Sequence, residues 1–301
     1  MRAARFAAGI LAALLGSGTG EASAASYPVT PNIVVGGAIA AVNPQTVPSG
    51  ANLVSCRSSV DRYPVVLVNG TFSVMENDFG GLAPDLANAG YCVYMFNYGY
   101  THPTDLIEAI GPVPASAQQL ASFVASVKRA TGAQQVDLVG HSQGGLLTEY
   151  YAKILQGAAN VHSIVALSPT THGTTLDGIA EHSAFFPGAN QIVDSACPAC
   201  VDQEVGSAVV TAVDNGPIAQ PGVIYTVIET LDETVVTPVG SSFINEPGVT
   251  NEYVQHFCPL DPVDHADLAY DNVVIQLVKN ALTPSKARKP SCLLEFPFPT
   301  E

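Results

Sequence analysis

The chain has 301 residues, of which 47% are hydrophobic and 12% are charged, so it can bury a large core and is not a disordered chain. Its formal net charge of −15 excludes nucleic acids and anionic membrane surfaces as favoured partners, because both would repel it. A neutral substrate is compatible with this charge.

The first residues have the pattern of an export signal. Arg2 and Arg5 supply positive charge, and residues 6–15 form an apolar run that is too short to cross a bilayer. Ala22-Ser23-Ala24 then provides the small-x-small pattern of a cleavage site. We predict a signal peptide at residues 1–24 and a secreted, extracellular protein.

Strand and helix patterns alternate along the rest of the chain. In chain order they predict an irregular lead-in (26–62), a strand (64–69), a helix (78–89), a strand (91–97), a helix (114–130), a strand (136–139), a helix (145–156), a strand (161–167), a cap or lid (172–220), a strand (223–228), a weaker strand (253–257) and a helix (273–282). This order is typical of the α/β class, with a mostly parallel central sheet covered by helices on both faces. We expect one catalytic domain over residues 25–301.

The motif Gly140-His-Ser-Gln-Gly144 directly follows a predicted strand and precedes a predicted helix. In that context Gly-x-Ser-x-Gly forms a sharp turn with its serine at the apex, and side chains at the glycine positions would crowd the turn. The helix N-terminus beside it favours negative charge. The motif therefore predicts Ser142 as a nucleophile.

A serine hydroxyl needs an adjacent base, and in this arrangement the acid and then the histidine follow the serine along the chain. His265 occupies a predicted loop between the last strand and the last helix, which makes it the expected base. The other histidines after Ser142 fall in predicted strands or ahead of the acid's loop: His162, His172, His182 and His256.

The acid should lie in the loop that follows strand 223–228. We predict Asp232 in this role, with Glu233 as the alternative. Such an acid orients the imidazole and stabilises its protonated form. Asp264, the neighbour of His265 in sequence, is expected at the solvated surface.

An oxyanion hole is expected from two segments. One donor is the N–H of the residue after the nucleophile, Gln143, and another comes from the loop after the first long strand. That loop reads Asn69-Gly70-Thr71-Phe72, in which Gly70 permits the turn and Thr71 can offer both its N–H and its hydroxyl.

Six cysteines in an exported chain indicate three disulfides, and the sequence pattern does not choose among the fifteen possible pairings. Cys197-Pro-Ala-Cys200 lacks a second cysteine pair with zinc spacing and a thioredoxin-like context, so we interpret it as a local structural disulfide. We find no metal-site pattern and no nicotinamide fingerprint, and we expect no cofactor.

Several segments together resemble secreted lipases of the α/β-hydrolase fold, both the bacterial ones and the family of Candida antarctica lipase B. In chain order these segments are Leu67-Val-Asn-Gly-Thr71, Ser142-Gln-Gly-Gly145, Ala166-Leu-Ser-Pro169 with Gly173-Thr174, Leu231-Asp-Glu-Thr-Val235 and Val263-Asp-His-Ala266. The similarity covers residues 56–292 at low overall identity. One departure is Asn69, where relatives carry His or Pro before the glycine.

This resemblance implies an α/β-hydrolase fold with a cap or lid, and a catalytic triad of Ser142, Asp232 and His265. It implies that Thr71 and Gln143 form the oxyanion hole. It also suggests the disulfides Cys56–Cys92 and Cys258–Cys292, which leaves Cys197–Cys200 as the third pair.

These residues predict a secreted serine ester hydrolase, a lipase or carboxylesterase that cleaves acyl esters such as triacylglycerols through an acyl-enzyme intermediate. The expected partners are a lipid or other acyl-ester substrate and a lipid–water interface, with no nucleic acid and no obligate protein partner. Two alternatives remain. One is a secreted acyltransferase or polyester hydrolase that uses the same triad. The other is a binding protein that keeps the fold without catalysis.

Overall fold

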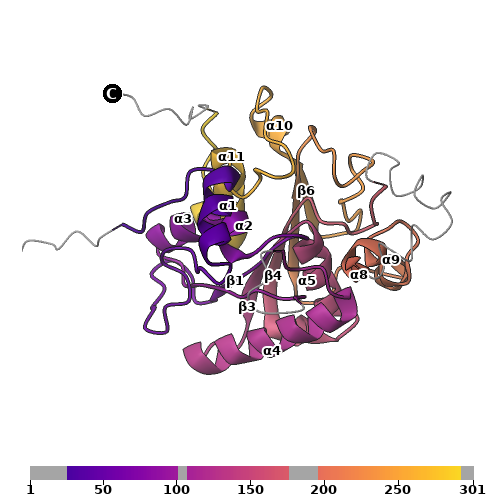
Figure 1. Cartoon of the computed structure of the whole chain (residues 1–301), viewed down its shortest axis with the longest axis horizontal. Helices are drawn as coiled ribbons and strands as arrows, with labels where there is room; N and C mark the ends of the chain where they lie inside the picture. The colour runs from indigo at the N-terminus through magenta and orange to yellow at the C-terminus, as the bar shows by residue number, and fades with distance from the viewer. Residues whose placement is uncertain (1–25, 101–106, 176–195, 293–301) are drawn as a thin grey trace, which may run out of the picture.

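A computed structural model describes residues 26–100, 107–175 and 196–292. Within these residues, six strands form one sheet in the order β2-β1-β3-β4-β5-β6, and every pair of neighbouring strands is parallel. Helices lie on both sides of the strands (Figure 1). The predicted α/β-hydrolase architecture with a parallel sheet is confirmed.

The strands are β1 (Val65–Val68), β2 (Val93–Met95), β3 (Val136–His141), β4 (Val161–Leu167), β5 (Ile224–Glu229) and β6 (Val249–Tyr253). The α-helices are α1 (Ile33–Val42), α2 (Met75–Phe79), α3 (Leu82–Asn88), α4 (Val113–Thr131), α5 (Gln143–Lys153), α8 (Pro198–Asp202), α9 (Ala208–Asp214), α10 (Val254–Phe257) and α11 (Asn272–Leu282). Two short 3-10 helices, η1 (Gly157–Asn160) and η2 (Pro284–Lys286), complete them.

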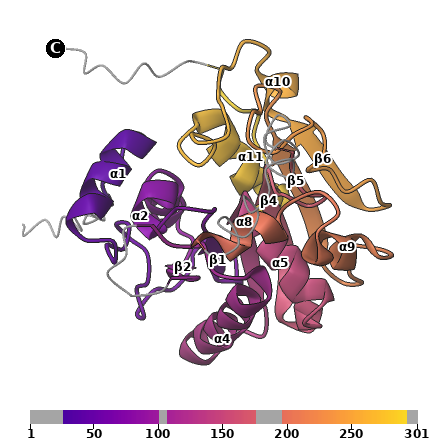
Figure 2. The ribbon, with the colours of Figure 1, turned by 45° about the vertical axis from the view of Figure 1, so that its right-hand side comes forward.

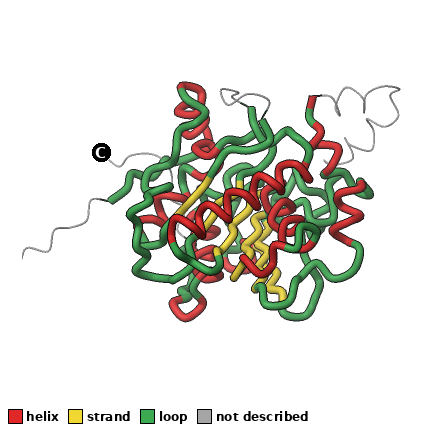
Figure 3. Tube along the Cα trace, turned by 90° about the horizontal axis from the view of Figure 1, so that it is seen from below, coloured by secondary structure: helices red, strands yellow, loops and turns green. Residues whose placement is uncertain are grey.

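The two faces of the sheet bury separate hydrophobic cores. Val65 and Leu67 of β1 point to the core under α2, α3 and α11, whereas Val66 and Val68 point to the core under α4 and α5. This alternation follows from the period of two in a strand, and it requires β1 to be apolar at every position. Figures 2 and 3 show the strands between the two groups of helices.

The lead-in contains a helix that its composition did not predict. In α1 the side chain of Asn32 accepts a hydrogen bond from the N–H of Val35 at 3.0 Å and caps the first turn. Gly36 packs so closely that a Cβ there would lie 2.5 Å from the Tyr270 hydroxyl oxygen. Helix α1 thus depends on a tertiary contact through a glycine, which local patterns do not reveal.

Two further elements differ from the prediction. The single helix expected at 78–89 is divided into α2 and α3 at Gly80 and Gly81, whose close contacts leave no room for side chains. The last strand is β6 rather than 253–257, and the predicted segment mostly forms α10. β6 is an edge strand of partly exposed residues, so it lacks the apolar signal of a buried strand.

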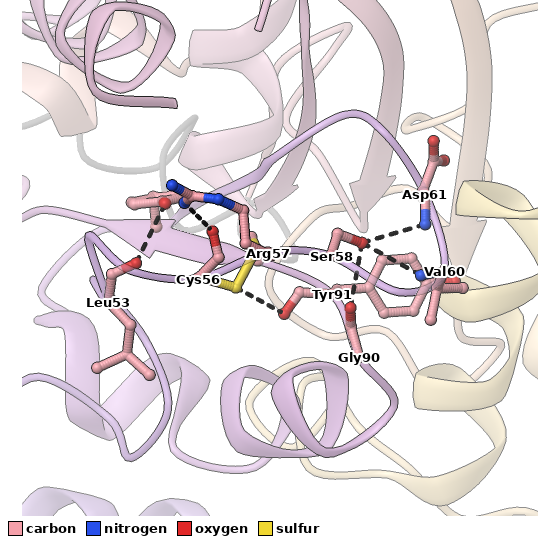
Figure 4. The surroundings of a disulfide bond; sticks show 10 residues. Leu53, Cys56, Arg57, Ser58, Val60, Asp61, Gly90 and Tyr91 are labelled. Carbon is pink, nitrogen blue, oxygen red and sulfur yellow. Dashed lines mark hydrogen bonds between the residues drawn. A yellow bond between two sulfur atoms is a disulfide. The ribbon is translucent and has the colours of Figure 1, made fainter. Parts of the chain in front are cut away.

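The structure confirms all three expected disulfides: Cys56–Cys92, Cys197–Cys200 and Cys258–Cys292. Around the first of them, Ser58 Oγ donates to the Gly90 carbonyl and accepts from the N–H groups of Val60 and Asp61 (Figure 4). The disulfide and these bonds fasten the lead-in to the turn before β2.

The predicted signal peptide and residues 176–195 of the predicted lid lie outside the described residues. The described part of the lid carries α8 and α9. Among the helices that the structure describes, none combines the length and the hydropathy needed to cross a membrane.

Candidate active site

Ser142 stands at the turn between β3 and α5, as the motif predicts. Its backbone adopts φ 55° and ψ −125°, a left-handed φ that non-glycine residues rarely adopt. A Cβ on Gly140 would lie 2.5 Å from the carbonyl carbon of Gly144, and one on Gly144 would lie 1.9 Å from the Val68 oxygen. The two glycines therefore allow the backbones of β1, β3 and α5 to meet.

The loop after β1 lies directly against the serine. A Cβ on Gly70 would approach the Ser142 Cβ to 3.1 Å. The Asn69 side chain braces this loop by donating to the carbonyls of Gly70 at 3.3 Å and Ser73 at 2.7 Å. Asn69 thus stabilises a tight turn, although it departs from the His or Pro expected by resemblance.

The two predicted oxyanion residues contact each other. The Thr71 hydroxyl and the Gln143 amide oxygen are 3.2 Å apart, and Gln203 in the loop after α8 donates its amide N–H to the Thr71 hydroxyl at 2.8 Å. Gln143 is the first residue of α5, where backbone N–H groups have no acceptor within the helix. The structure therefore brings Thr71 and Gln143 together beside Ser142.

The carboxylate that contacts His265 is the alternative, Glu233, and not the predicted Asp232. Glu233 Oε2 lies 2.8 Å from His265 Nδ1, and the Glu233 side chain is buried. Asp232 is exposed, and its backbone pairs with Asp264 in an isolated parallel bridge. In an extended segment successive side chains point to opposite sides, so the outward orientation of Asp232 directs Glu233 inward.

Hydrogen bonds hold the Glu233 carboxylate in its ionised form. Its second oxygen, Oε1, accepts the N–H groups of Val235 at 2.8 Å and Val236 at 3.0 Å. Burial alone would raise the pKa of Glu233, but His265 and these two donors outweigh burial and lower the pKa to about 2. Glu233 is therefore a fixed negative charge at neutral pH.

The surroundings of His265 favour its neutral imidazole. Burial lowers the pKa of its imidazole below the ordinary value, and the charge of the neighbouring His141 lowers it further, while Glu233 partly opposes both effects. Because Nδ1–H donates to the Glu233 carboxylate, Nε2 carries the free lone pair of the neutral ring.

One cavity connects these groups. It has a volume of about 260 Å³, and Ser142, His265, Gly70 and Thr71 all line it. The strands are parallel, so the loops that follow β1, β3, β5 and β6 meet at one edge of the sheet. Side chains far apart in the sequence are thereby gathered around a single serine.

The other histidines that follow Ser142 in the sequence have different surroundings. His162 contacts buried Asp137 at 2.7 Å, and His172 contacts Asp214 at 2.7 Å. His256 is exposed on α10, and His182 lies outside the described residues. None of the three described side chains lines the cavity of Ser142.

Two residues near the site were not predicted from the sequence. Gln203 contacts Thr71, and Asp78 Oδ2 accepts the N–H of Gly70 at 2.7 Å. Gln203 belongs to the irregular cap segment, and no local pattern marks it. Asp78 follows Gly70 by eight residues on α2, a spacing that carries no signal of contact.

Comparisons with known proteins identify a lipase family. The family description "Lipase (class 2)" matches residues 62–278. A triacylglycerol lipase of Pseudomonas fragi is 31% identical over 131 residues, which cover 42% of this chain and 41% of the relative. One of Pseudarthrobacter phenanthrenivorans is 38% identical over 98 residues, which cover 31% and 29%. The chain thus matches less than half the length of these curated relatives.

Solved structures support the fold. Lipase B of Aspergillus fumigatus superimposes with a TM-score of 0.60 at 19% identity, covering 83% of this chain and 62% of that one. The lipase BlEst2 of Bacillus licheniformis superimposes with a TM-score of 0.52 at 18% identity, covering 78% and 96%. With the family match extending over more than half of its residues, the chain belongs to the class 2 lipase family.

Proposed function

We propose that this chain is a secreted serine ester hydrolase, a lipase or carboxylesterase that cleaves acyl esters such as triacylglycerols. The observation that carries the proposal is the convergence of Ser142, His265 and Thr71 on one cavity, with Glu233 bonded to His265 Nδ1. Nucleophile, base, acid and oxyanion donors are then all present in one place.

In the proposed reaction, Ser142 Oγ attacks the ester carbonyl while His265 Nε2 accepts the hydroxyl proton. The backbone N–H groups of Thr71 and Gln143 stabilise the oxyanion, each such donor contributing about 3 kcal/mol to the transition state. The imidazolium then gives its proton to the leaving alcohol, and an acyl-enzyme remains. Water, activated by His265, releases the acid and restores Ser142.

Apolar surfaces around the cavity favour water-insoluble acyl chains. Phe72 lines the cavity and is 54% exposed, and Ile33 lines it from the start of α1. Along the same helix Val34 is 76% and Val42 is 88% exposed. The sequence has no charged residue from 22 to 56, although the whole chain is strongly acidic. This uncharged segment, which reaches the cavity at Ile33, suits a neutral lipid–water interface.

Export is part of the proposal. A signal peptide at residues 1–24 would deliver the chain to an oxidising compartment, where three disulfides form and persist. We also propose residues 172–220 as the lid, since Cys200 and Gln203 of its described part line the cavity.

The direct test is Ser142→Ala, measured on p-nitrophenyl esters and on emulsified triacylglycerols. Ser73→Ala is the matched control, because Ser73 lines the same cavity outside the motif. We expect Ser142→Ala to abolish both hydrolysis and labelling by a fluorophosphonate, and Ser73→Ala to keep both. More than about a thousandth of wild-type activity in Ser142→Ala would contradict the proposal.

The alternative functions change the products or the labelling. An acyltransferase would pass the acyl group to added alcohols or sugars in preference to water, and a polyester hydrolase would release soluble fragments from polymer films. A binding protein without catalysis would not react with the fluorophosphonate.

A further inference from the structure

The side chain of His141, the residue before the nucleophile, lies between two hydrogen-bond acceptors. Its Nδ1 is 2.7 Å from Asp78 Oδ1, and its Nε2 is 3.0 Å from the backbone carbonyl oxygen of His265. His141 is 4% exposed and Asp78 is 1% exposed. The ring centroids of His141 and His265 are 4.8 Å apart.

These partners determine the proton on each nitrogen. A carbonyl oxygen can only accept, so Nε2 of His141 carries a proton. Asp78 accepts the Gly70 N–H through its other oxygen, as a carboxylate does, so Nδ1 of His141 donates to it as well. Burial alone would lower the pKa of His141, but the charge of Asp78 and the hydrogen bonds outweigh burial and raise it. The two acceptors and the raised pKa together favour the imidazolium form of the buried His141 side chain.

Asp78 and His141 together contact both the loop of the expected oxyanion donor and the backbone of His265. Through Gly70, Asp78 holds the loop that carries the oxyanion donor. Through its carbonyl, His265 is held by His141. Neither side chain is needed to transfer a proton in the reaction proposed above, so the pair is unexplained by the triad.

We propose that Asp78 and His141 are positioning residues, a charged pair that sets the oxyanion loop and the His265 backbone in one fixed arrangement around Ser142. The inference rests on the proposed function. His141 also places a positive charge beside His265 and disfavours protonation of the base, which keeps it neutral at lower pH.

Removing His141 should therefore change two quantities. A misplaced base or oxyanion donor lowers kcat, and a shift of about 1 Å is enough to cost about 100-fold. The negative charge of Asp78, left without its cation, would stabilise protonated His265 and move the acid limb of the pH–rate profile to higher pH. The charged or titratable groups around the pair are Glu233, His265, Tyr98 and Tyr270.

Three variants separate positioning from packing. His141→Phe removes both donors and leaves Asp78 unpaired, whereas Asp78→Asn combined with His141→Phe removes the pair without leaving a buried charge. His141→Gln restores one N–H that can reach the His265 carbonyl. Each variant is assayed for kcat, KM and the acid limb on a short soluble p-nitrophenyl ester, per active site titrated with a p-nitrophenyl phosphonate, and its melting temperature is measured.

We expect His141→Phe to lose about 100-fold in kcat with KM nearly unchanged, and to shift the acid limb upward. His141→Gln should recover part of kcat while keeping the shifted limb. The double variant should have low kcat with an acid limb between those of the wild type and His141→Phe. This set of results would support the proposal.

Two results would overturn the inference alone: variants that fold and keep wild-type kcat and acid limb with only a lower melting temperature, or failure of all three variants to fold. Either result would assign the pair to stability. A wild-type chain that neither hydrolyses the ester nor reacts with the phosphonate would overturn the proposed function, and this inference with it.

Discussion

The serine side and the histidine side of the site are built in different ways. On the serine side, backbones meet through glycines, and the contacts at Gly140 and Gly144 leave no room for a Cβ. On the histidine side, a buried carboxylate of Glu233 holds His265 through side-chain hydrogen bonds. The first arrangement depends on backbone contacts at the glycines of one motif, whereas the second depends on which carboxylate a loop turns inward.

This difference explains why the sequence motif predicts one side better than the other. Glycine is required at fixed positions of the motif, because any side chain there would collide with the backbone. A carboxylate requirement can be met by either of two adjacent residues, and the loop's path selects between them. Substitution of a glycine on the serine side should therefore abolish folding and activity. On the histidine side, the loss of activity should depend on which of the two acids is replaced.

The largest effect is expected from Gly144→Ala. The added methyl would lie 1.9 Å from the Val68 carbonyl oxygen, so β1 and α5 could not keep their contact. We expect loss of folded, active protein, measured by circular dichroism and active-site titration. Gly37→Ala on α1 is the control, because a Cβ there meets nothing within 4 Å, and it should fold normally. Full activity in Gly144→Ala would show that the serine elbow, the turn from β3 through Ser142 into α5, is not sterically constrained.

The next effect tests the choice between neighbouring acids. Glu233→Gln should lower kcat by about 10³- to 10⁴-fold, because the amide cannot stabilise the imidazolium as the carboxylate does. Asp232→Asn should remain close to wild type, since the Asp232 side chain is exposed and the carboxylate bonded to His265 Nδ1 is that of Glu233. Both are measured as kcat on a soluble ester. The reverse ranking would restore Asp232, the acid predicted from the sequence.

The third effect concerns pH and the state of the base. Because the folded-state pKa of His265 lies below the ordinary value of 6.5, activity should persist below pH 6.5 before falling on the acid side. The measurement is kcat/KM between pH 4 and 8 on a substrate that does not titrate. A half-maximal point above 6.5 would mean that Glu233 outweighs burial and His141.

The smallest effect concerns the stability of the serine helix. Glu149 on α5 is buried and accepts a hydrogen bond from Thr171, and burial raises its pKa to about 8. The folded state therefore keeps a proton that the unfolded state releases above its pKa near 4.5, and stability contributed by this group falls as pH rises from 4.5 to 8.

Glu149→Gln removes this titration, so its melting temperature should exceed that of the wild type by a few degrees at pH 8.5. At pH 4 the two proteins should melt at similar temperatures, which serves as the control. If the melting-temperature difference between the variant and the wild type were the same at both pH values, Glu149 would have the same pKa in the folded and unfolded states.

Several parts of the fold and site were predictable because they depend on local patterns. The apolar runs of β1, β3 and β4 and the glycines around Ser142 mark the sheet and the elbow. The order of motifs predicted that His265 and the loops of Thr71 and Gln143 lie beside Ser142, and the structure brings them together there. The family resemblance indicated the disulfides, which the structure confirms.

Other parts were decided only by tertiary contacts. Helix α1 forms against α2 and Tyr270, and the edge strand β6 has too little apolar character to be recognised. The inward turn of Glu233 depends on pairing between residues 232 and 264, which are 32 positions apart.

By itself, the sequence determined the parallel α/β sheet and the serine elbow, because strand period and glycine sterics act over short stretches of chain. It also pointed to His265, because the order of the motifs can be read directly along the chain. Only the tertiary structure decided that Glu233 rather than Asp232 meets His265, and that Asp78 and His141 join the two sides. These choices depend on where distant backbones place a side chain, and burial then makes each contact strong enough to hold.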